Sequence, residues 1–313
     1  MKRAFVFPGQ GSQAPGMGKA LAEAFPTARL LFEEVDDALS QHLSRLMFEG
    51  PESDLTLTEN AQPALLAVSL AVVRVLEAEA GFDIAGQVAY VAGHSLGEYS
   101  ALAAARAISV PDAARLVKRR GQAMQKAVPV GEGAMAALLG LELDAAREVA
   151  AEAAAGGVCA VANDNSPGQV VVSGHASAVE RAVALAASRG ARRSIMLPVS
   201  APFHSPLMAP AADMMAEALE EIALQAPVVP LVANVTAKPT EDPEEIKELL
   251  VEQVTRMVRW RETVLLFTEN EVEEVVELGA GRVLAGLAKR IARDLGTVSV
   301  GAPAELEALI KRL

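Results

Sequence analysis

The chain has 313 residues, of which 51% are hydrophobic, so it can bury a large core as one large domain or as a main domain with a smaller companion. Its formal net charge of -12 argues against nucleic acid or an anionic membrane as a general partner. The longest uncharged apolar run near the N-terminal half, 60–73, contains a proline and is too short to span a bilayer, and no signal-peptide core follows the first residues. The single cysteine, Cys159, lies in an apolar strand pattern, where we expect a buried, inert thiol. We therefore expect a soluble cytoplasmic protein without disulfides.

Short β-rich runs alternate with longer segments of helical periodicity along most of the chain. The expected strands are 4–7, 88–92, 194–200, 230–235, 274–279 and 297–301. Because these strands are apolar throughout and are separated by helices, we expect a mostly parallel sheet that helices cover on both faces.

Residues 93–97, Gly-His-Ser-Leu-Gly, follow the expected strand 88–92 and open an alanine-rich helical segment. A G-x-S-x-G sequence between a strand and a helix is the nucleophile-elbow pattern, in which the glycines make room for a serine on a sharp, strained turn. The helix that follows would aim free N–H groups at the point where an oxyanion forms. We therefore expect Ser95 to be a nucleophile on a large α/β-hydrolase-like domain; an ordinary glycine-rich turn is the alternative.

A serine hydroxyl needs a base within hydrogen-bond distance. His94 is adjacent to Ser95, but successive residues on a turn point apart, so we expect His94 to pack rather than to act as the base. His204 follows an expected strand in a loop, where parallel α/β folds collect their sites, and is the stronger candidate; a surface histidine is the alternative. The four histidines are far apart in the sequence, so we expect no metal site.

Residues 109–128 form an amphipathic helical pattern with Pro111 at the first helical position. Arg120 falls within the apolar stripe of this helix, and no acidic residue shares its face. A guanidinium that faces the core is costly unless it is paired. Either the carboxylate of a substrate is its partner, or a distant Asp or Glu is, or the side chain reaches solvent.

The stretch from 129 to 199 has a different order of expected elements: strand, helix, strand, a turn at 166–168, strand, helix, strand. This βαββαβ order is that of ferredoxin-like domains. We therefore expect a small ferredoxin-like domain, 129–199, inserted in a large catalytic domain made of 1–128 and 200–313.

Several segments in all parts of the chain form a specific combination: FPGQGSQ (7–13), GHSLGEYSAL (93–102), RRGQAMQ (119–125), NSPGQVVVSG (165–174), PFHSPLM (202–208) and ELGAGRVLAGLAKRI (277–291). Together they closely resemble the malonyl-CoA:acyl carrier protein transacylases of bacterial fatty acid synthesis. The resemblance implies an acyltransferase that moves a malonyl group from malonyl-CoA to the phosphopantetheine thiol of acyl carrier protein by a ping-pong mechanism, without a cofactor.

The resemblance also implies a role for individual residues. Ser95 matches the serine that is acylated, His204 its general base and Arg120 the anchor of the malonyl carboxylate. The backbone N–H groups of Gln10 and Leu96 match the oxyanion hole. The backbone carbonyl of Gln253 matches the one that orients the histidine, and Phe203 fits a malonyl rather than a methylmalonyl pocket.

Acyl carrier protein is acidic, and so is this chain, which means that docking requires a local group of basic residues. Lys289, Arg290 and Arg293 are the first candidates, on one expected helix, and Arg192 and Arg193 come next. A solvated helix face without a partner is the alternative.

Three other functions are open. A serine thioesterase or esterase of the α/β-hydrolase type shares the elbow, but it would carry an acid that orients the histidine and an HGGG-like oxyanion loop, and neither is apparent. Dinucleotide binding rests on a loose G-x-G-x-x-A match at 9–14, which Pro8 and the lack of a second strand ending in an acid weaken. A non-catalytic carrier-protein docking module would not need Ser95, His204 and Arg120 together.

Overall fold

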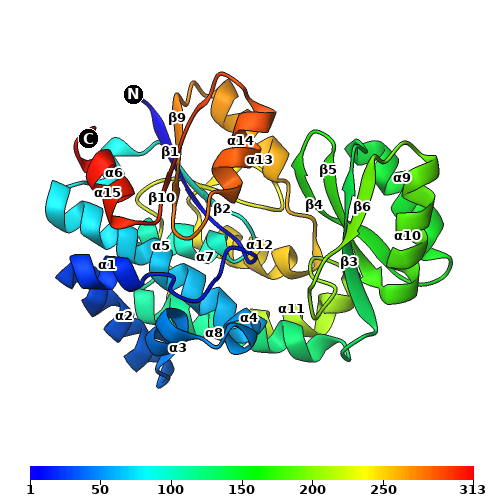
Figure 1. The fold of residues 1–313 in the computed structure, drawn as a ribbon, viewed down its shortest axis with the longest axis horizontal. Coiled ribbons are helices and arrows are strands. Elements are labelled where there is room, and N and C mark those ends of the chain that lie inside the picture. The colour runs from blue at the N-terminus through cyan, green and yellow to red at the C-terminus, as the bar shows by residue number, and fades with distance from the viewer.

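The computed structural model describes residues 1–313 and contains two β-sheets with helices around them (Figure 1). The larger sheet has six strands in the order β10-β9-β1-β2-β7-β8. All of its neighbouring strands pair in parallel except β8, which is antiparallel to β7. The expectation of a largely parallel sheet is confirmed. Its strands are β1 (Arg3–Phe7), β2 (Tyr90–Gly93), β7 (Leu231–Val232), β8 (Pro239–Thr240), β9 (Glu274–Leu278) and β10 (Gly296–Val300).

Strand β1 shows why its apolar run is continuous. Successive side chains of a strand point to opposite faces of the sheet. Phe5 and Phe7 enter a core on one face, whereas Ala4 and Val6 enter a second core on the other face. All four side chains are fully buried, because helices cover the sheet on both sides.

Helices α5 and α7 lie against one face of this sheet and α13 and α14 against the other (Figure 1). Helix α8 begins after Ser109, whose hydroxyl accepts a hydrogen bond from the N–H of Asp112. Pro111 occupies the second position of its first turn, one position later than expected. The helices of this part are α1 (Lys19–Ala24), α2 (Pro26–Leu39), α3 (Leu43–Glu49), α4 (Glu52–Thr56), α5 (Thr58–Ala80), α6 (Ile84–Gln87), α7 (Gly97–Ala104), α8 (Val110–Ala127), the short 3₁₀-helix η1 (Pro206–Met208), α11 (Ala209–Glu220), α12 (Pro243–Thr255), α13 (Trp260–Glu269), α14 (Val283–Ile291) and α15 (Pro303–Ile310).

Helix α5 is longer than the apolar run 60–73 that the sequence suggests. It has 23 residues and a window with a mean hydropathy of 1.5, so by length and composition alone it could cross a membrane. In the fold, 83% of that window is buried inside the protein. The helix is therefore apolar all round because it is a central core helix.

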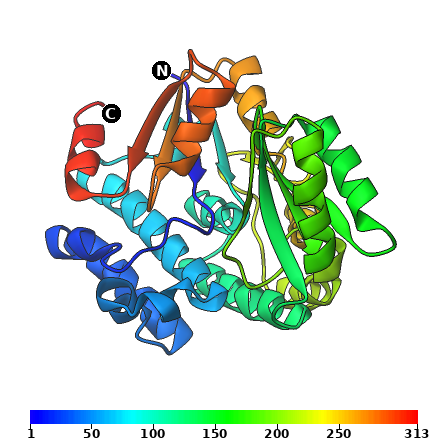
Figure 2. The ribbon, with the colours of Figure 1, turned by 45° about the vertical axis from the view of Figure 1, so that its right-hand side comes forward.

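The smaller sheet has four antiparallel strands in the order β4-β5-β3-β6. The elements follow one another as β3 (Gly133–Leu139), α9 (Leu143–Ala154), β4 (Cys159–Ser166), β5 (Gln169–His175), α10 (Ala176–Ser188) and β6 (Arg193–Met196). Figure 2 shows α9 and α10 on the outer side of this sheet, with the other side facing the rest of the molecule. The sequence predicts a turn at 166–168; in the structure Ser166 still belongs to β4, and Gly168, with a φ of 69°, closes a two-residue turn before β5.

Four expected strands are shorter than predicted, and one of them, 274–279, loses only its last residue because β9 ends at Leu278. The expected strand 194–200 ends at Met196, two residues before Pro198, which has no N–H for a ladder. The expected strand 230–235 forms only the short β7, because the chain turns back at Ala233 to pair with Lys238. The expected strand 88–92 begins two residues later, at Tyr90.

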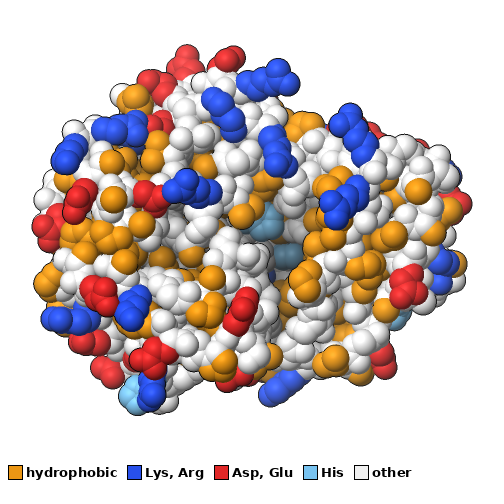
Figure 3. Space-filling view, in the orientation of Figure 1, with side chains coloured by type: hydrophobic (Ala, Val, Ile, Leu, Met, Phe, Trp, Pro, Cys, Tyr) orange, Lys and Arg blue, Asp and Glu red, His pale blue; other side chains and the backbone are white.

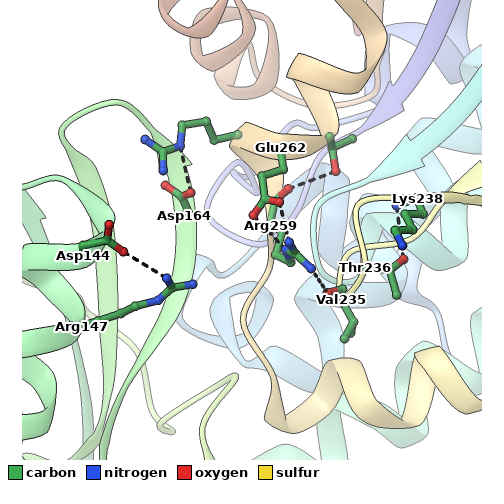
Figure 4. Close-up of polar contacts among 10 residues, drawn as sticks. Asp144, Arg147, Asp164, Val235, Thr236, Lys238, Arg259 and Glu262 are labelled. Atoms are coloured by element: carbon green, nitrogen blue, oxygen red, sulfur yellow. Dashed lines mark hydrogen bonds and ion pairs between the residues drawn. The ribbon is translucent and has the colours of Figure 1, made fainter. Parts of the chain in front are cut away.

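Strand β4 of the smaller sheet contacts the segment that leads into α13 of the larger part, and Figure 4 shows this region. The backbone of Val258 exchanges hydrogen bonds with β4, accepting from Asp164 and donating to Ala162. Nε of Arg261 donates to Oδ2 of Asp164 at 2.9 Å. Because the side chain of Asp164 is fully buried, this ion pair joins the smaller sheet firmly to the larger part.

Candidate active site

Ser95 lies on the sharp turn between β2 and α7. Its φ of 54° lies in the left-handed region, which residues other than glycine rarely adopt. A Cβ on Gly93 would lie 1.8 Å from the backbone carbon of Gly97, and a Cβ on Gly97 would lie 2.1 Å from the oxygen of Phe7. Only glycine fits at both positions, which is the reason that the elbow pattern requires them.

The imidazole of His204 faces the hydroxyl of Ser95. Its Nε2 lies 2.8 Å from Oγ of Ser95, and its Nδ1 lies 2.8 Å from the backbone oxygen of Gln253. Since a carbonyl oxygen only accepts, Nδ1 carries the proton, and Nε2 is left to accept the proton of the serine. The backbone carbonyl of Gln253 thus lies where a carboxylate orients the histidine of other triads.

The protonation state of His204 suits a base. Burial lowers its pKa to about 3, the positive charge of Arg120 acts in the same direction, and the hydrogen bond with Gln253 opposes both. The imidazole is therefore neutral at neutral pH and can take up a proton.

The guanidinium of Arg120 lies in the same cluster, with 1% of the residue exposed. Its Nη2 donates to Oγ of Ser95 at 3.0 Å and to Oε1 of Gln253 at 2.7 Å, and its Nη1 donates to Oε1 of Gln62 at 2.9 Å. All three acceptors are uncharged, and no Asp or Glu oxygen lies within 4.0 Å, the ion-pair limit.

A guanidinium has five N–H groups, so further donors of Arg120 are open to an incoming acceptor. Its Nε is buried and has no hydrogen-bond partner. A buried charge without an opposite charge is unfavourable. The arrangement therefore suits an anion that enters from outside and binds beside Ser95.

A cavity of about 440 Å³ lies between the two parts of the molecule and is lined by Ser95, His204, Arg120 and Gln62. Figure 3 shows a hollow at this position between the two parts of the molecule, with histidine side chains at its floor. Gln10, Leu96 and Phe203 line the same cavity. The backbone N–H groups of Gln10 and Leu96 donate to no other backbone group, so they are free to bind an oxyanion.

The sequence matches the family model of the acyl transferase domain over residues 4–306. The chain belongs to the acyl transferase family. It is 46% identical over 313 residues to the malonyl CoA-acyl carrier protein transacylase of Bacillus subtilis (strain 168), covering 100% of this chain and 97% of the relative. It is 44% identical over 308 residues to the protein of the same name from Escherichia coli (strain K12), covering 98% of each.

Solved structures agree with this family. The acyl-carrier-protein-S-malonyltransferase from Bartonella henselae is 55% identical, with a TM-score of 0.97, and the match covers 100% of this chain and 99% of that one. A type II PKS acyl-carrier protein in complex with its malonyl-transacylase contains a chain that is 44% identical, with a TM-score of 0.96 and complete coverage of both chains.

Neither His94 nor Cys159 takes part in the contact between Ser95 and His204. His94 lines the cavity, but its Nε2 lies 2.9 Å from Oδ1 of Asn165 and its ring packs against Trp260, so it packs as expected. Cys159 is buried as expected, and burial raises the pKa of its thiol to about 11, which disfavours the reactive thiolate form. No group of three or more His, Cys, Asp or Glu side chains is arranged to hold a metal ion.

Sequence reasoning missed three polar side chains that form hydrogen bonds to the residues of the site: Gln62, Glu98 and Asn234. All three are buried. Oδ1 of Asn234 accepts from the N–H of Ser95 at 2.8 Å, which ties the elbow to the segment after β7. Glu98 had a detectable signal, because it is a charged residue inside an apolar helix, the same anomaly that drew attention to Arg120.

The structure corrects the grouping of the candidate docking residues. Lys289 and Arg290 lie in the last turn of α14, but Arg293 lies beyond the helix, which ends at Ile291 with an extended residue after it. The helix ends there because the chain must extend toward β10, with Leu295 buried on the way. All five candidates, including Arg192 and Arg193, are exposed.

Proposed function

We propose that this acyl transferase moves a malonyl group from malonyl-CoA to the phosphopantetheine thiol of acyl carrier protein through a malonyl ester on Ser95. The observation that carries the proposal is the buried guanidinium of Arg120, 3.0 Å from the serine hydroxyl and without a carboxylate partner in the chain. A malonyl group brings a free carboxylate to this point, whereas an acetyl group leaves the charge unpaired. Relatives of the same length carry this activity in their names.

In the first half-reaction, Nε2 of His204 takes the proton of Ser95 while Oγ attacks the thioester carbonyl of malonyl-CoA. A carbon–oxygen bond forms, and the N–H groups of Leu96 and Gln10 hold the oxyanion. When the intermediate collapses, the carbon–sulfur bond breaks, and His204 returns the proton to coenzyme A. The product is a malonyl ester of Ser95.

The second half-reaction repeats these steps with a different thiol. His204 takes the proton of the phosphopantetheine thiol, the sulfur attacks the ester carbonyl, and the carbon–oxygen bond to Ser95 breaks. The proton returns to the serine. Because one thioester is exchanged for another, we propose that the reaction needs neither ATP nor a cofactor.

Selection of the acyl group has two proposed parts. Arg120 binds the malonyl carboxylate in a charge-assisted pair, so that acyl groups without a carboxylate react less well. Phe203 lines the cavity beside His204 and limits its width, which favours malonyl over the branched methylmalonyl group.

For carrier-protein docking we propose the exposed residues Lys289 and Arg290 first, with Arg293, Arg192 and Arg193 in addition. Figure 3 shows Lys and Arg side chains along the upper edge of the hollow, which suits an acidic partner. If docking is electrostatic, the rate of transfer to acyl carrier protein falls steeply with added salt. A rate that does not respond to salt would contradict this docking surface.

We also propose the finer architecture expected from the sequence. The antiparallel order β4-β5-β3-β6 supports a ferredoxin-like domain over 129–199, and the elbow beside a parallel sheet supports an α/β-hydrolase-like domain over 1–128 and 200–313. A cytoplasmic location stays a prediction.

The proposed function is tested by mass spectrometry of the intact protein after mixing with malonyl-CoA alone, followed by peptide mapping. We expect one malonyl group on the peptide that contains Ser95, and its loss when acyl carrier protein with a phosphopantetheine thiol is added. Ser95→Ala removes the adduct, whereas Ser100→Ala, which changes a buried serine of the following helix α7, keeps it. Rapid release of free malonate without an adduct would indicate a thioesterase, and no reaction would indicate a docking module; either result refutes the proposal.

A further inference from the structure

Glu98 is a buried carboxylate behind the active site that the proposed steps do not use. It lies in the first turn of α7, three residues after Ser95, and is 1% exposed. Its Oε2 accepts from Nε2 of Gln253 at 2.5 Å, and its Oε1 accepts from the backbone N–H of Asn234 at 3.4 Å. No Lys or Arg nitrogen lies within 4.0 Å of it. Because a buried carboxylate without a cation is unfavourable, its presence calls for a functional reason.

The side-chain amide of Gln253 connects Glu98 to the site. Its Oε1 accepts from Nη2 of Arg120 at 2.7 Å, and its Nε2 donates to Glu98 and, at 3.0 Å, to the backbone oxygen of Ser95. The backbone oxygen of the same residue lies 2.8 Å from Nδ1 of His204. One fully buried residue therefore contacts the nucleophile, the base and the guanidinium.

The amide of Gln253 has two orientations that differ by exchange of its oxygen and nitrogen. In the orientation found, the oxygen faces the guanidinium of Arg120 and the NH2 group faces Glu98. In the other, the NH2 group would face the guanidinium, so that donors oppose donors, and the oxygen would face a carboxylate, so that acceptors oppose acceptors. Oε2 of Glu98 stabilises the orientation found by accepting from Nε2 of Gln253. When the carboxyl is ionised it also disfavours the second orientation, because an ionised carboxylate only accepts.

We propose that Glu98 is a positioning residue that acts through Gln253. By accepting from Nε2 it holds Oε1 toward Arg120, and this keeps the guanidinium aimed at the carboxylate of the acyl group. Since Gln253 stands between the two charges, Glu98 orients Arg120 without forming an ion pair that would occupy it. The inference rests on the proposed function, because it concerns selection of a malonyl group at the same site.

The test compares transfer of malonyl and acetyl groups from their CoA thioesters in variants of Glu98. Glu98→Met is similar in length but has no acceptor, and we expect its malonyl-to-acetyl ratio of kcat/KM to fall about tenfold, the loss of one charge-assisted hydrogen bond. Glu98→Gln keeps one carbonyl oxygen for Gln253, and we expect a ratio close to that of the wild type. Glu98→Asp keeps the charge but withdraws it by one methylene, so its ratio falls as well; this variant serves if Glu98→Met does not fold.

Two controls separate positioning from general damage. Glu277 is another buried carboxylate, which accepts from the backbone N–H groups of Leu284 and Ala285. Glu277→Met makes the same substitution outside the cavity that Ser95 and Arg120 line. We therefore expect its malonyl-to-acetyl ratio to stay unchanged even if its stability falls. The variant Arg120→Ala has no guanidinium for Glu98 to position. The double variant Arg120→Ala, Glu98→Met therefore has the same malonyl-to-acetyl ratio of kcat/KM as Arg120→Ala alone.

The inference is overturned if Glu98→Met and Glu98→Asp keep the wild-type ratio, or if they lose both activities equally. It is also overturned if Glu98→Gln is as impaired as Glu98→Met, or if Glu98→Met shifts the ratio further in Arg120→Ala. These outcomes leave the proposed function intact, provided that the wild-type protein forms a malonyl ester on Ser95. A wild-type protein that forms none removes the proposed function itself.

Discussion

Replacing Arg120 by alanine tests whether its guanidinium selects the acyl group. The change removes the charge and the donor that contacts Oγ of Ser95 at 3.0 Å. It also leaves the amide oxygens of Gln62 and Gln253 without their donor. The loss of these contacts affects every acyl group alike, whereas the loss of an ion pair with the substrate affects only an acyl group that carries a carboxylate.

The expected size of the effect follows from the number of contacts. A hydrogen bond to a charged group contributes about 1.5–3 kcal/mol, and a guanidinium binds a carboxylate through two such bonds. A loss of about 3 kcal/mol corresponds to about a 150-fold fall in kcat/KM for malonyl-CoA. Transfer of acetyl groups falls less or rises, because the wild-type protein leaves Arg120 unpaired when acetyl binds.

The assay measures kcat/KM for both CoA thioesters with acyl carrier protein as the acceptor. Arg119→Ala is the matched control, since the side chain of this neighbour on α8 is partly exposed and pairs with Glu221. Arg120→Lys keeps the charge without the planar fork, so we expect an intermediate ratio. If Arg120→Ala kept the malonyl-to-acetyl ratio of the wild type, the reasoning would be refuted, however much the absolute rates fell.

Other predictions concern pH and stability. Because the pKa of His204 is about 3, we expect the rate at which a neutral sulfonyl fluoride labels Ser95 not to decline as the pH falls through 6.5, the ordinary pKa of histidine. The measurement uses the variant Glu98→Gln, so that titration of Glu98 does not contribute. A decline near pH 6.5 would contradict the lowered pKa of His204. Burial raises the pKa of Glu98 from 4.5 to about 7, although hydrogen bonds and the nearby guanidinium oppose the shift. Between pH 4.5 and about 7, the folded state therefore binds more protons than the unfolded state. We expect the wild type to lose stability relative to Glu98→Gln as the pH rises through this range, so the difference between their free energies of unfolding falls. A difference that is constant or rises with pH, measured by urea unfolding, would show that this pKa is not raised. Arg261→Ala leaves the carboxylate of Asp164 buried and unpaired and lowers the free energy of unfolding by about 3 kcal/mol. The double variant Arg261→Ala, Asp164→Asn recovers part of the lost free energy of unfolding. No recovery would mean that the ion pair between Arg261 and Asp164 does not stabilise the contact of β4 with the larger part.

Ser95, His204 and Arg120 could be proposed from the sequence as nucleophile, base and anchor because each stands out locally. Ser95 lies between two glycines where a strand becomes a helix, and Arg120 occupies an apolar stripe. His204 follows a strand in a loop. The structure brings all three together, as the hydrogen-bond distances between Oγ of Ser95 and both partners show.

The hydrogen bonds that position the site residues could not be predicted from the sequence. Glu98 and Gln253 are 155 positions apart, and a contact between them depends on how α7 and α12 pack rather than on any local periodicity. The position of Arg293 depended on the end of α14, and helix ends are difficult to place without a clear capping residue. The short β7 likewise reflects a turn that the apolar run 230–235 concealed.

The central claim is that the carboxylate of the acyl group binds the guanidinium beside Ser95. A crystal structure of the protein acylated by malonyl-CoA tests it most directly. We predict a malonyl ester on Oγ of Ser95 whose carboxylate oxygens lie about 3 Å from nitrogen atoms of Arg120. A carboxylate that points into solvent or binds another residue, with Arg120 still held only by amide oxygens of the protein, would contradict the account.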